Sequence, residues 1–175
     1  MIAPGDSFAV RITPPRAGTY IYHTHAEEML QLRKGLFGAL IVLPAGVPEP
    51  DSTDRLLILS DAGPEAPATG AARDTLGYTL SAGVAHRLRI VSIPGVTLLK
   101  VRLLRDTTRQ TWRPIAKDGA DLPPSRTVEQ PAEASFGPGE TLDVEIHRRG
   151  PERLILEVTK VALKPTVFQI PVTVH

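Results

Sequence analysis

Residues 139–158 read GETLDVEIHRRGPERLILEV, and this stretch decides the fold class. Its first half, Thr141–Ile146, places an aliphatic side chain at every second position, with Asp143 and Glu145 between them. Arg153–Val158 repeats the alternation after a basic turn. A period of two is typical of a strand that buries one face and exposes the other. The stretch therefore predicts two half-buried strands.

Similar short apolar runs recur along the chain, separated by turns rich in proline (17 residues) and glycine (14 residues). We expect further strands at Ser7–Thr13, Thr19–His25, Gly35–Leu43, Arg55–Ser60, Leu76–Leu80, His86–Ile93, Thr97–Leu104, Trp112–Ala116 and Val167–Val174. Only Ala26–Arg33 has a weak helical spacing, which predicts a short helical turn. Many short strands with frequent turns indicate an all-β sandwich or barrel.

Three details of this pattern can be tested in the structure. Phe8, Val10 and Ile12 should share one face of the first strand. Gly35–Leu43 is nearly continuous apolar sequence, which predicts a strand buried on both faces. Pro171 has no backbone N–H, and it therefore indicates an edge strand or a bulge at the end of the chain.

The composition of Pro44–Asp54 is typical of a linker. We expect one unit at residues 1–46, a linker at 47–54 and a larger β-sandwich at 55–175. Residues 1–46 supply only three expected strands, which bury too little surface to stand alone. This part should either pack on something else or leave apolar side chains such as Phe8, Val10 or Ile41 exposed.

The charge and residue counts narrow the classes of function. Lys and Arg total 20 against 19 Asp and Glu, so no broad basic field favours nucleic acid or a membrane surface. No apolar run approaches the length of a transmembrane helix, and the first residues do not resemble a secretory signal. The chain has no cysteine, which excludes disulfides and thiolate metal ligands from it.

His23 and His25 are separated by one residue, so on a strand both side chains would project from the same face. Two neutral imidazoles that face one way can form a metal-ligand pair. Spacing alone also fits histidines that face solvent or bond to backbone groups.

The residues around this pair carry a family resemblance. Residues 16–25 read RAGTYIYHTH, and residues 35–42 read GLFGALIV. Together with residues 4–8, PGDSF, they closely resemble the first copper motif of the multicopper oxidases, the laccase-like proteins built from cupredoxin domains. Residues 112–123 and 139–144 resemble the family's following cupredoxin-like domain more loosely. The resemblance implies a cupredoxin-like Greek-key β-sandwich, one partial and one near-complete.

By this resemblance, His23 and His25 would be ligands of the type 3 coppers of a trinuclear cluster that reduces dioxygen to water. Glu27, Glu28 and Gln31 follow directly and would orient an imidazole or relay protons. The alternative for each of these three is a solvated acidic turn. No residue of the chain is expected to be catalytic.

The family's other copper motifs and its blue-copper cysteine are absent from this chain. We therefore expect a segment of a longer oxidase, inactive alone, whose remaining ligands come from other cupredoxin domains or another subunit. The family resemblance implies a periplasmic or extracellular location. Two alternatives stay open: a non-catalytic module that binds a single Cu or Zn, and a structural β-sandwich that acts as an interaction domain.

The remaining histidines are expected to be ordinary surface residues. His86 opens an alternating strand beside two arginines, which favours an exposed position. His147 lies in the basic turn, and His175 ends the chain. Trp112, the single tryptophan, is expected to anchor the core.

Overall fold

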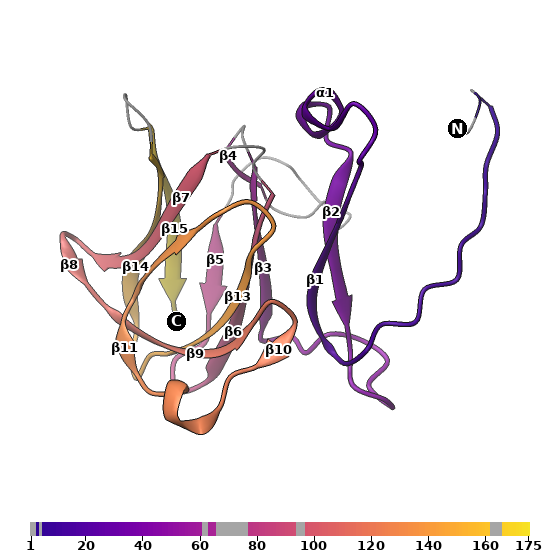
Figure 1. Ribbon diagram of the computed structural model, residues 1–175. Helices are drawn as coiled ribbons and strands as arrows, with labels where there is room; N and C mark the ends of the chain where they lie inside the picture. The colour runs from indigo at the N-terminus through magenta and orange to yellow at the C-terminus, as the bar shows by residue number, and fades with distance from the viewer. Residues whose placement is uncertain (1–2, 4, 61–62, 66–76, 94–96, 162–165) are drawn as a thin grey trace.

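Two β-sheets packed face to face form the body of the molecule, and a β-hairpin lies against the outside of one of them (Figure 1). The computed structural model describes residues 3, 5–60, 63–65, 77–93, 97–161 and 166–175. In these residues the helical elements are α1 (Glu28–Arg33) and a 3-10 turn at Pro124–Arg126. The prediction of an all-β fold is confirmed, as is the short helical turn.

The larger sheet has the strand order β10-β9-β13-β6-β3-β4, with β11 also paired to β9. Its strands are β3 (Asp54–Ser60), β4 (Gly63–Glu65), β6 (Ala85–Ser92), β9 (Thr111–Lys117), β10 (Ala120–Asp121), β11 (Gln130–Pro131) and β13 (Thr141–His147).

The second sheet has the order β12-β7-β14-β15-β5, with β8 paired to β7. Its strands are β5 (Tyr78–Leu80), β7 (Leu98–Arg105), β8 (Thr108–Arg109), β12 (Glu133–Phe136), β14 (Glu152–Val161) and β15 (Thr166–Val174). Two neighbouring pairs, β3 with β6 and β15 with β5, are parallel. The two strands of residues 139–158 fall in different sheets, so the chain crosses the sandwich between β13 and β14.

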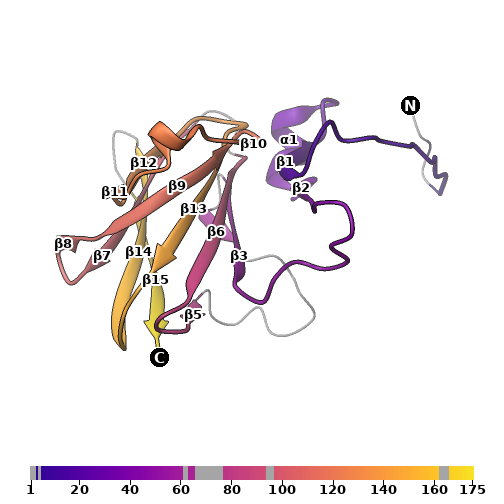
Figure 2. The same ribbon diagram turned by 90° about the horizontal axis from the view of Figure 1, so that it is seen from below.

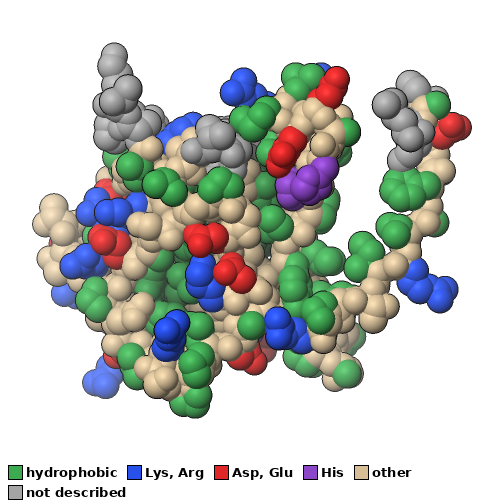
Figure 3. Space-filling view, viewed as in Figure 1, with side chains coloured by type: hydrophobic (Ala, Val, Ile, Leu, Met, Phe, Trp, Pro, Cys, Tyr) green, Lys and Arg blue, Asp and Glu red, His purple; other side chains and the backbone are tan. Residues whose placement is uncertain are grey.

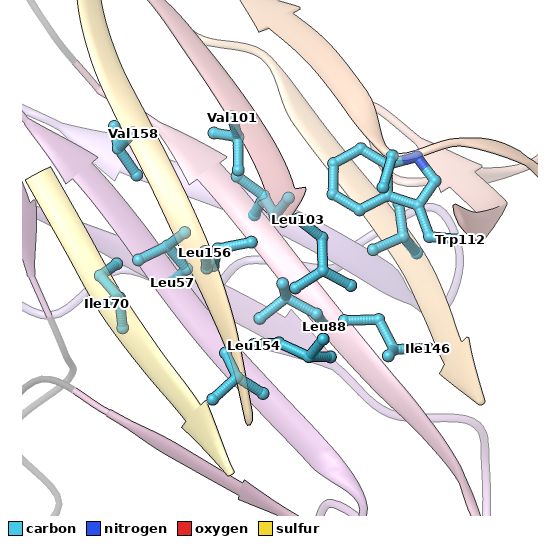
Figure 4. Packing of buried hydrophobic residues seen from close by; sticks show 14 of the residues in the cluster. Leu57, Leu88, Val101, Leu103, Trp112, Ile146, Leu154, Leu156, Val158 and Ile170 are labelled. Carbon is cyan, nitrogen blue, oxygen red and sulfur yellow. The ribbon is translucent and has the colours of Figure 1, made fainter. Parts of the chain in front are cut away.

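The core fills the space between the sheets (Figure 4). Leu142, Val144 and Ile146 enter it from β13, and every second residue of β14 faces them from the other sheet. Trp112 is 1% exposed and anchors this core from β9, as expected. The alternating aliphatic residues of β13 and β14 therefore face the core between the two sheets.

The hairpin consists of β1 (Gly18–His23) and β2 (Phe37–Val42), paired antiparallel from Gly18 opposite Val42 to His23 opposite Phe37. It lies beside the outer face of the larger sheet, next to β6 and β3 (Figure 2). A small apolar cluster joins the two parts, because Ile21 and Phe37 of the hairpin pack with Ile58 and Val91 of the sheet. A two-stranded sheet is marginal alone in water, so this contact supports it.

Glycine permits the closest approach between the hairpin and the sandwich. A Cβ on Gly18 would come 2.6 Å from the carbonyl oxygen of Gly119, which lies in the turn before β10 with φ of +74°. The same carbonyl accepts hydrogen bonds from Arg16 Nε at 3.0 Å and Tyr20 Oη at 3.3 Å. The N-terminal end of β1 is thus fixed against the larger sheet.

Ser7–Thr13, expected as a strand, forms no strand in the structure. The segment runs away from the body as an extended chain (Figure 1), and Phe8, Val10 and Ile12 are 69%, 67% and 67% exposed. A strand requires a hydrogen-bonding neighbour, and none of the described residues pairs with this segment. Ile41, in contrast, is half-buried on β2.

Two further expectations were wrong, one about β2 and one about His86. β2 is not buried on both faces, because Leu40 is 37% exposed. Pro171 stands opposite Ile155 in a continuous register, so it forms no bulge. Among the described residues, β5 joins β15 only from Val172 onward, so Pro171 lies at the edge of the sheet, which is one of the two alternatives expected for it.

His86 was expected at the surface but is 3% exposed. Its Nε2 accepts a hydrogen bond from the backbone N–H of Ser81 at 2.8 Å. Burial, reinforced by the nearby positive charge of Arg55, lowers the pKa of His86 below its ordinary value. The unfolded chain therefore takes up a proton at this position at a higher pH than the folded chain does.

This difference predicts that stability falls as the solution becomes acidic. The contribution of neutral His86 is complete above an unfolded pKa of about 6.5 and is lost as the pH falls below it. The free energy of unfolding, measured in urea between pH 7 and pH 5, should decline less steeply in His86→Gln than in the parent. One group accounts for at most about 1.4 kcal/mol per pH unit. His147→Gln, at an exposed position, should retain the parent slope; equal slopes in all three proteins would contradict the prediction.

Candidate metal centre

The two histidines of the predicted pair lie next to each other at the end of β1. β1 ends at His23, so His25 follows the strand rather than continuing it. Their ring centroids are nevertheless 4.6 Å apart, with an angle of 40° between the ring planes. His23 is half-buried and His25 is exposed. Figure 3 displays histidine side chains (purple) at the surface of this region, close to acidic ones (red).

Glu28 is the carboxylate nearest to this pair. Its Oε1 lies 3.4 Å from Nδ1 of His23, close enough for electrostatic attraction, although the geometry does not form a hydrogen bond. The side chain of His23 is 23% exposed and that of Glu28 is 45% exposed. Histidines that ligate metals usually present one ring nitrogen to a carboxylate or carbonyl and the other to the metal. The position of Glu28 beside Nδ1 leaves Nε2 of His23 for such a role.

Neither of the other two predicted neighbours forms a hydrogen bond or an ion pair with the rings. Gln31, on α1, lies with Oε1 2.5 Å from the hydroxyl oxygen of Thr24. Glu27 is exposed and occupies the left-handed region with φ of 47°, at the start of α1. Gln31 therefore acts on the turn between the two histidines, and Glu27 shapes the entry into the helix.

Thr24 organises the turn that brings the rings together. Its Oγ1 accepts a hydrogen bond from the backbone N–H of Ala26 at 3.2 Å. Its own backbone N–H donates to the carbonyl of Leu36 at 3.4 Å, next to the start of β2. Threonine side chains commonly bond to the backbone N–H two residues later, which favours a turn. The threonine between the two histidines is therefore a local sequence signal for this turn, and the sequence prediction did not use it.

The donors that this region offers to a metal are the two imidazoles of His23 and His25. Within the described residues, no group of three or more His, Cys, Asp or Glu side chains could enclose a metal ion. Imidazole nitrogen is a suitable ligand for copper and zinc. Two adjacent imidazoles, one of them open to solvent, fit a metal whose other ligands come from outside the described chain.

A cavity of about 650 Å³ lies elsewhere, between the β8–β9 and β13–β14 connections. Its charged groups are largely satisfied by one another: Arg113 pairs with Glu145, and Arg148 pairs with Glu152. His147 also lines this cavity, far along the chain from the pair at β1. The cavity does not bring metal-ligating side chains together, so the pair at β1 is the better candidate for chemistry.

Comparisons with known proteins point to the same region. A sequence model of the family described as multicopper oxidase matches residues 1–46. Multicopper oxidase CTB12 from Cercospora beticola is 46% identical over 43 residues, which are 25% of this chain and 6% of that protein. The resemblance to the multicopper oxidases is confirmed. Copper is the metal that this family implies.

Solved multicopper oxidases share the fold of almost the whole chain. The blue copper oxidase from Nitrosomonas europaea superposes with a TM-score of 0.69 and 22% identity, over 99% of this chain and 61% of its own. Fet3p, described as a multicopper oxidase that functions in iron import, superposes with a TM-score of 0.68 and 14% identity, over 90% and 34%. The cupredoxin-like fold is therefore established for this chain, which spans less than two thirds of these relatives.

Within the described residues, no helix is long and apolar enough to cross a membrane.

The role of Thr24 in this turn can be tested directly. Thr24→Val keeps the shape of the side chain but removes the acceptor for the Ala26 N–H. A hydrogen bond worth about 1 kcal/mol corresponds to about fivefold faster amide exchange at Ala26. Thr79→Val, at an exposed position of β5, is the matched control and should leave the exchange of Ala26 unchanged. Equal exchange rates at Ala26 in Thr24→Val and the parent would contradict this assignment.

Proposed function

We propose that this chain is the copper-binding portion of a multicopper oxidase. In this proposal His23 and His25 supply two imidazole ligands to the type 3 coppers of a trinuclear cluster that reduces dioxygen. The observation that carries it is the 4.6 Å approach of the two rings within the segment that matches the family.

The surroundings of the pair support a ligand role over a structural one. His25 is exposed, so its ring does not serve the core. Glu28 lies 3.4 Å from Nδ1 of His23 and favours the tautomer that carries its proton there, which leaves the lone pair on Nε2. Thr24 and α1 hold the second histidine beside the first. These residues bind and orient; the bound copper would supply the electron transfer to dioxygen.

The same observations support an incomplete centre. Two imidazoles do not saturate a copper cluster, and the chain lacks the cysteine of a blue-copper site. We propose that the remaining ligands come from other cupredoxin domains or from another subunit. The exposed apolar side chains of Phe8, Val10 and Ile12 precede β1 in the chain and favour a protein partner for this N-terminal segment. A periplasmic or extracellular location, frequent among multicopper oxidases, belongs to this proposal.

Copper titration tests the ligand assignment. The parent should bind Cu²⁺ at the histidine pair, and His23→Ala/His25→Ala should lose at least about tenfold in affinity, because imidazole is the main donor type at the site. His147→Ala/His175→Ala removes two exposed histidines elsewhere and should bind as the parent does. If the His23/His25 double variant binds copper as tightly as the parent, both metal-binding interpretations fail and a structural β-sandwich remains.

A second measurement addresses turnover. We expect the purified, copper-loaded chain to consume no oxygen above background with a phenolic substrate, because it lacks the blue-copper cysteine that would accept the electrons. An oxygen electrode records the rate. Sustained, copper-dependent consumption that disappears in His23→Ala/His25→Ala would contradict the proposed dependence on outside ligands. The alternative is a non-catalytic module that binds a single Cu or Zn. It would be favoured if the chain bound one metal ion with the same affinity in the absence and in the presence of the other cupredoxin domains.

A further inference from the structure

A cluster of charged and polar side chains is buried between the hairpin and the sandwich. Its acceptor is Asp143 of β13, whose Oδ2 lies 3.0 Å from Arg87 Nε, 3.2 Å from Arg89 Nη1 and 2.9 Å from the hydroxyl oxygen of Thr19. The other Nη of Arg89 donates to Asp54 Oδ2 at 2.8 Å. We call these five residues the anchor cluster.

Thr19 is the residue that β1 contributes to this cluster. Its hydroxyl donates to Asp143 and accepts from Arg89 Nη1 at 2.9 Å, so it bridges the two charges. Its carbonyl accepts a third bond from the hydroxyl of Thr141 at 3.2 Å. Thr19 and Asp143 are each 1% exposed, and Arg89 is 6% exposed. The hairpin therefore covers the charged side chains of Asp143 and Arg89, and its Thr19 supplies a hydrogen-bond partner to both of them.

A buried ion cluster of this kind favours one arrangement over its neighbours more than it adds stability. In the folded protein the charged groups of Asp143 and Arg89 are shielded from water. Asp143 Oδ1 and Arg89 Nε also have no hydrogen-bond partner among the described residues. A shift of β1 would leave further charged groups unsatisfied, which is costly in a buried place. The apolar contacts beside it, such as Ile21 against Val91, would tolerate a small slide much better.

The arrangement of β1 extends from the cluster to the histidine pair. Alternate residues of a strand share a face, so Thr19, Ile21 and His23 all project from the side that meets the sandwich. Burial agrees at the far end of β1, where Ile21 and His23 are half-buried and the intervening Tyr22 is 59% exposed; Tyr20, on the other face, is half-buried against Gly119. Four residues of strand span about 13 Å, with no free rotation between the anchored residue and the ligand.

We propose that Thr19 is a positioning residue for the metal site: through Asp143 and Arg89 it fixes the placement of His23 relative to the sandwich. This inference rests on the proposed copper-ligand role of the pair. A pair that meets ligands from another domain has to be presented at a fixed position, and the anchor cluster supplies that constraint.

The test compares Thr19→Val, which keeps the shape and removes the hydroxyl, with Thr19→Ser, which keeps the hydroxyl. Thr79→Val is the matched control on an exposed strand position. In metal-free protein, the ring protons of His23 should give one set of NMR signals in the parent, Thr19→Ser and Thr79→Val. Thr19→Val should give doubled or broadened signals while the core methyl signals stay unchanged.

Each outcome separates the two claims. A single, unchanged set of His23 signals in Thr19→Val overturns the positioning role, whatever copper does. If the His23 signals change as expected but the parent binds no copper, the proposed function fails and Thr19 remains a determinant of the hairpin's placement. Should Thr19→Val fail to fold, Asp143→Asn provides the second variant, and it should double the His23 signals in the same way; unchanged signals there would overturn the proposal.

Discussion

The burial of Asp143 and Arg89 beneath Thr19 is the constraint on which the arrangement of the molecule depends. Both charges lie on the outer face of a sheet, where solvent would normally cover them. The hairpin covers them instead, and the hydroxyl of Thr19 bonds to both. A two-stranded sheet has little stability of its own, so the position of β1 is set by what the sandwich presents to it. The histidine pair takes its position from that arrangement.

Much of this fold follows from residue pattern. The alternation in Thr141–Ile146 and Arg153–Val158 corresponds to β13 and β14, and Trp112 lies in the core as its size and apolar character suggest. These are local signals, and burial on one face reinforces each of them. Where a segment lacks a neighbour, the same signal misleads. Ser7–Thr13 has good alternation but no strand to pair with, and pairing is not encoded in one segment alone.

The interface between hairpin and sandwich was the least predictable part. Asp143 projects from the outer face of β13, as its place between aliphatic residues predicts. That face is covered by Thr19 of the hairpin, so Asp143 is only 1% exposed. His86 likewise reads as a surface residue beside two arginines and is buried. Sequence pattern distinguishes the two faces of a strand but does not say what covers the outer one. The pair His23 and His25 was identified by spacing and resemblance, whereas the turn at Thr24 emerged only from the structure. Of the three neighbours expected to act on the pair, the structure places Glu28 beside His23.

The central claim is that two imidazoles of this chain form part of a copper site whose other ligands lie elsewhere. Electron paramagnetic resonance of the Cu²⁺-loaded chain, with histidine labelled by ¹⁵N, counts the imidazoles bound to the metal most directly. Coupling to the nitrogens of His23 and His25, with the remaining positions taken by water or buffer, is the result that the account predicts. Coupling that persists when both residues are replaced, or copper held by a full set of donors from the sandwich, would contradict it.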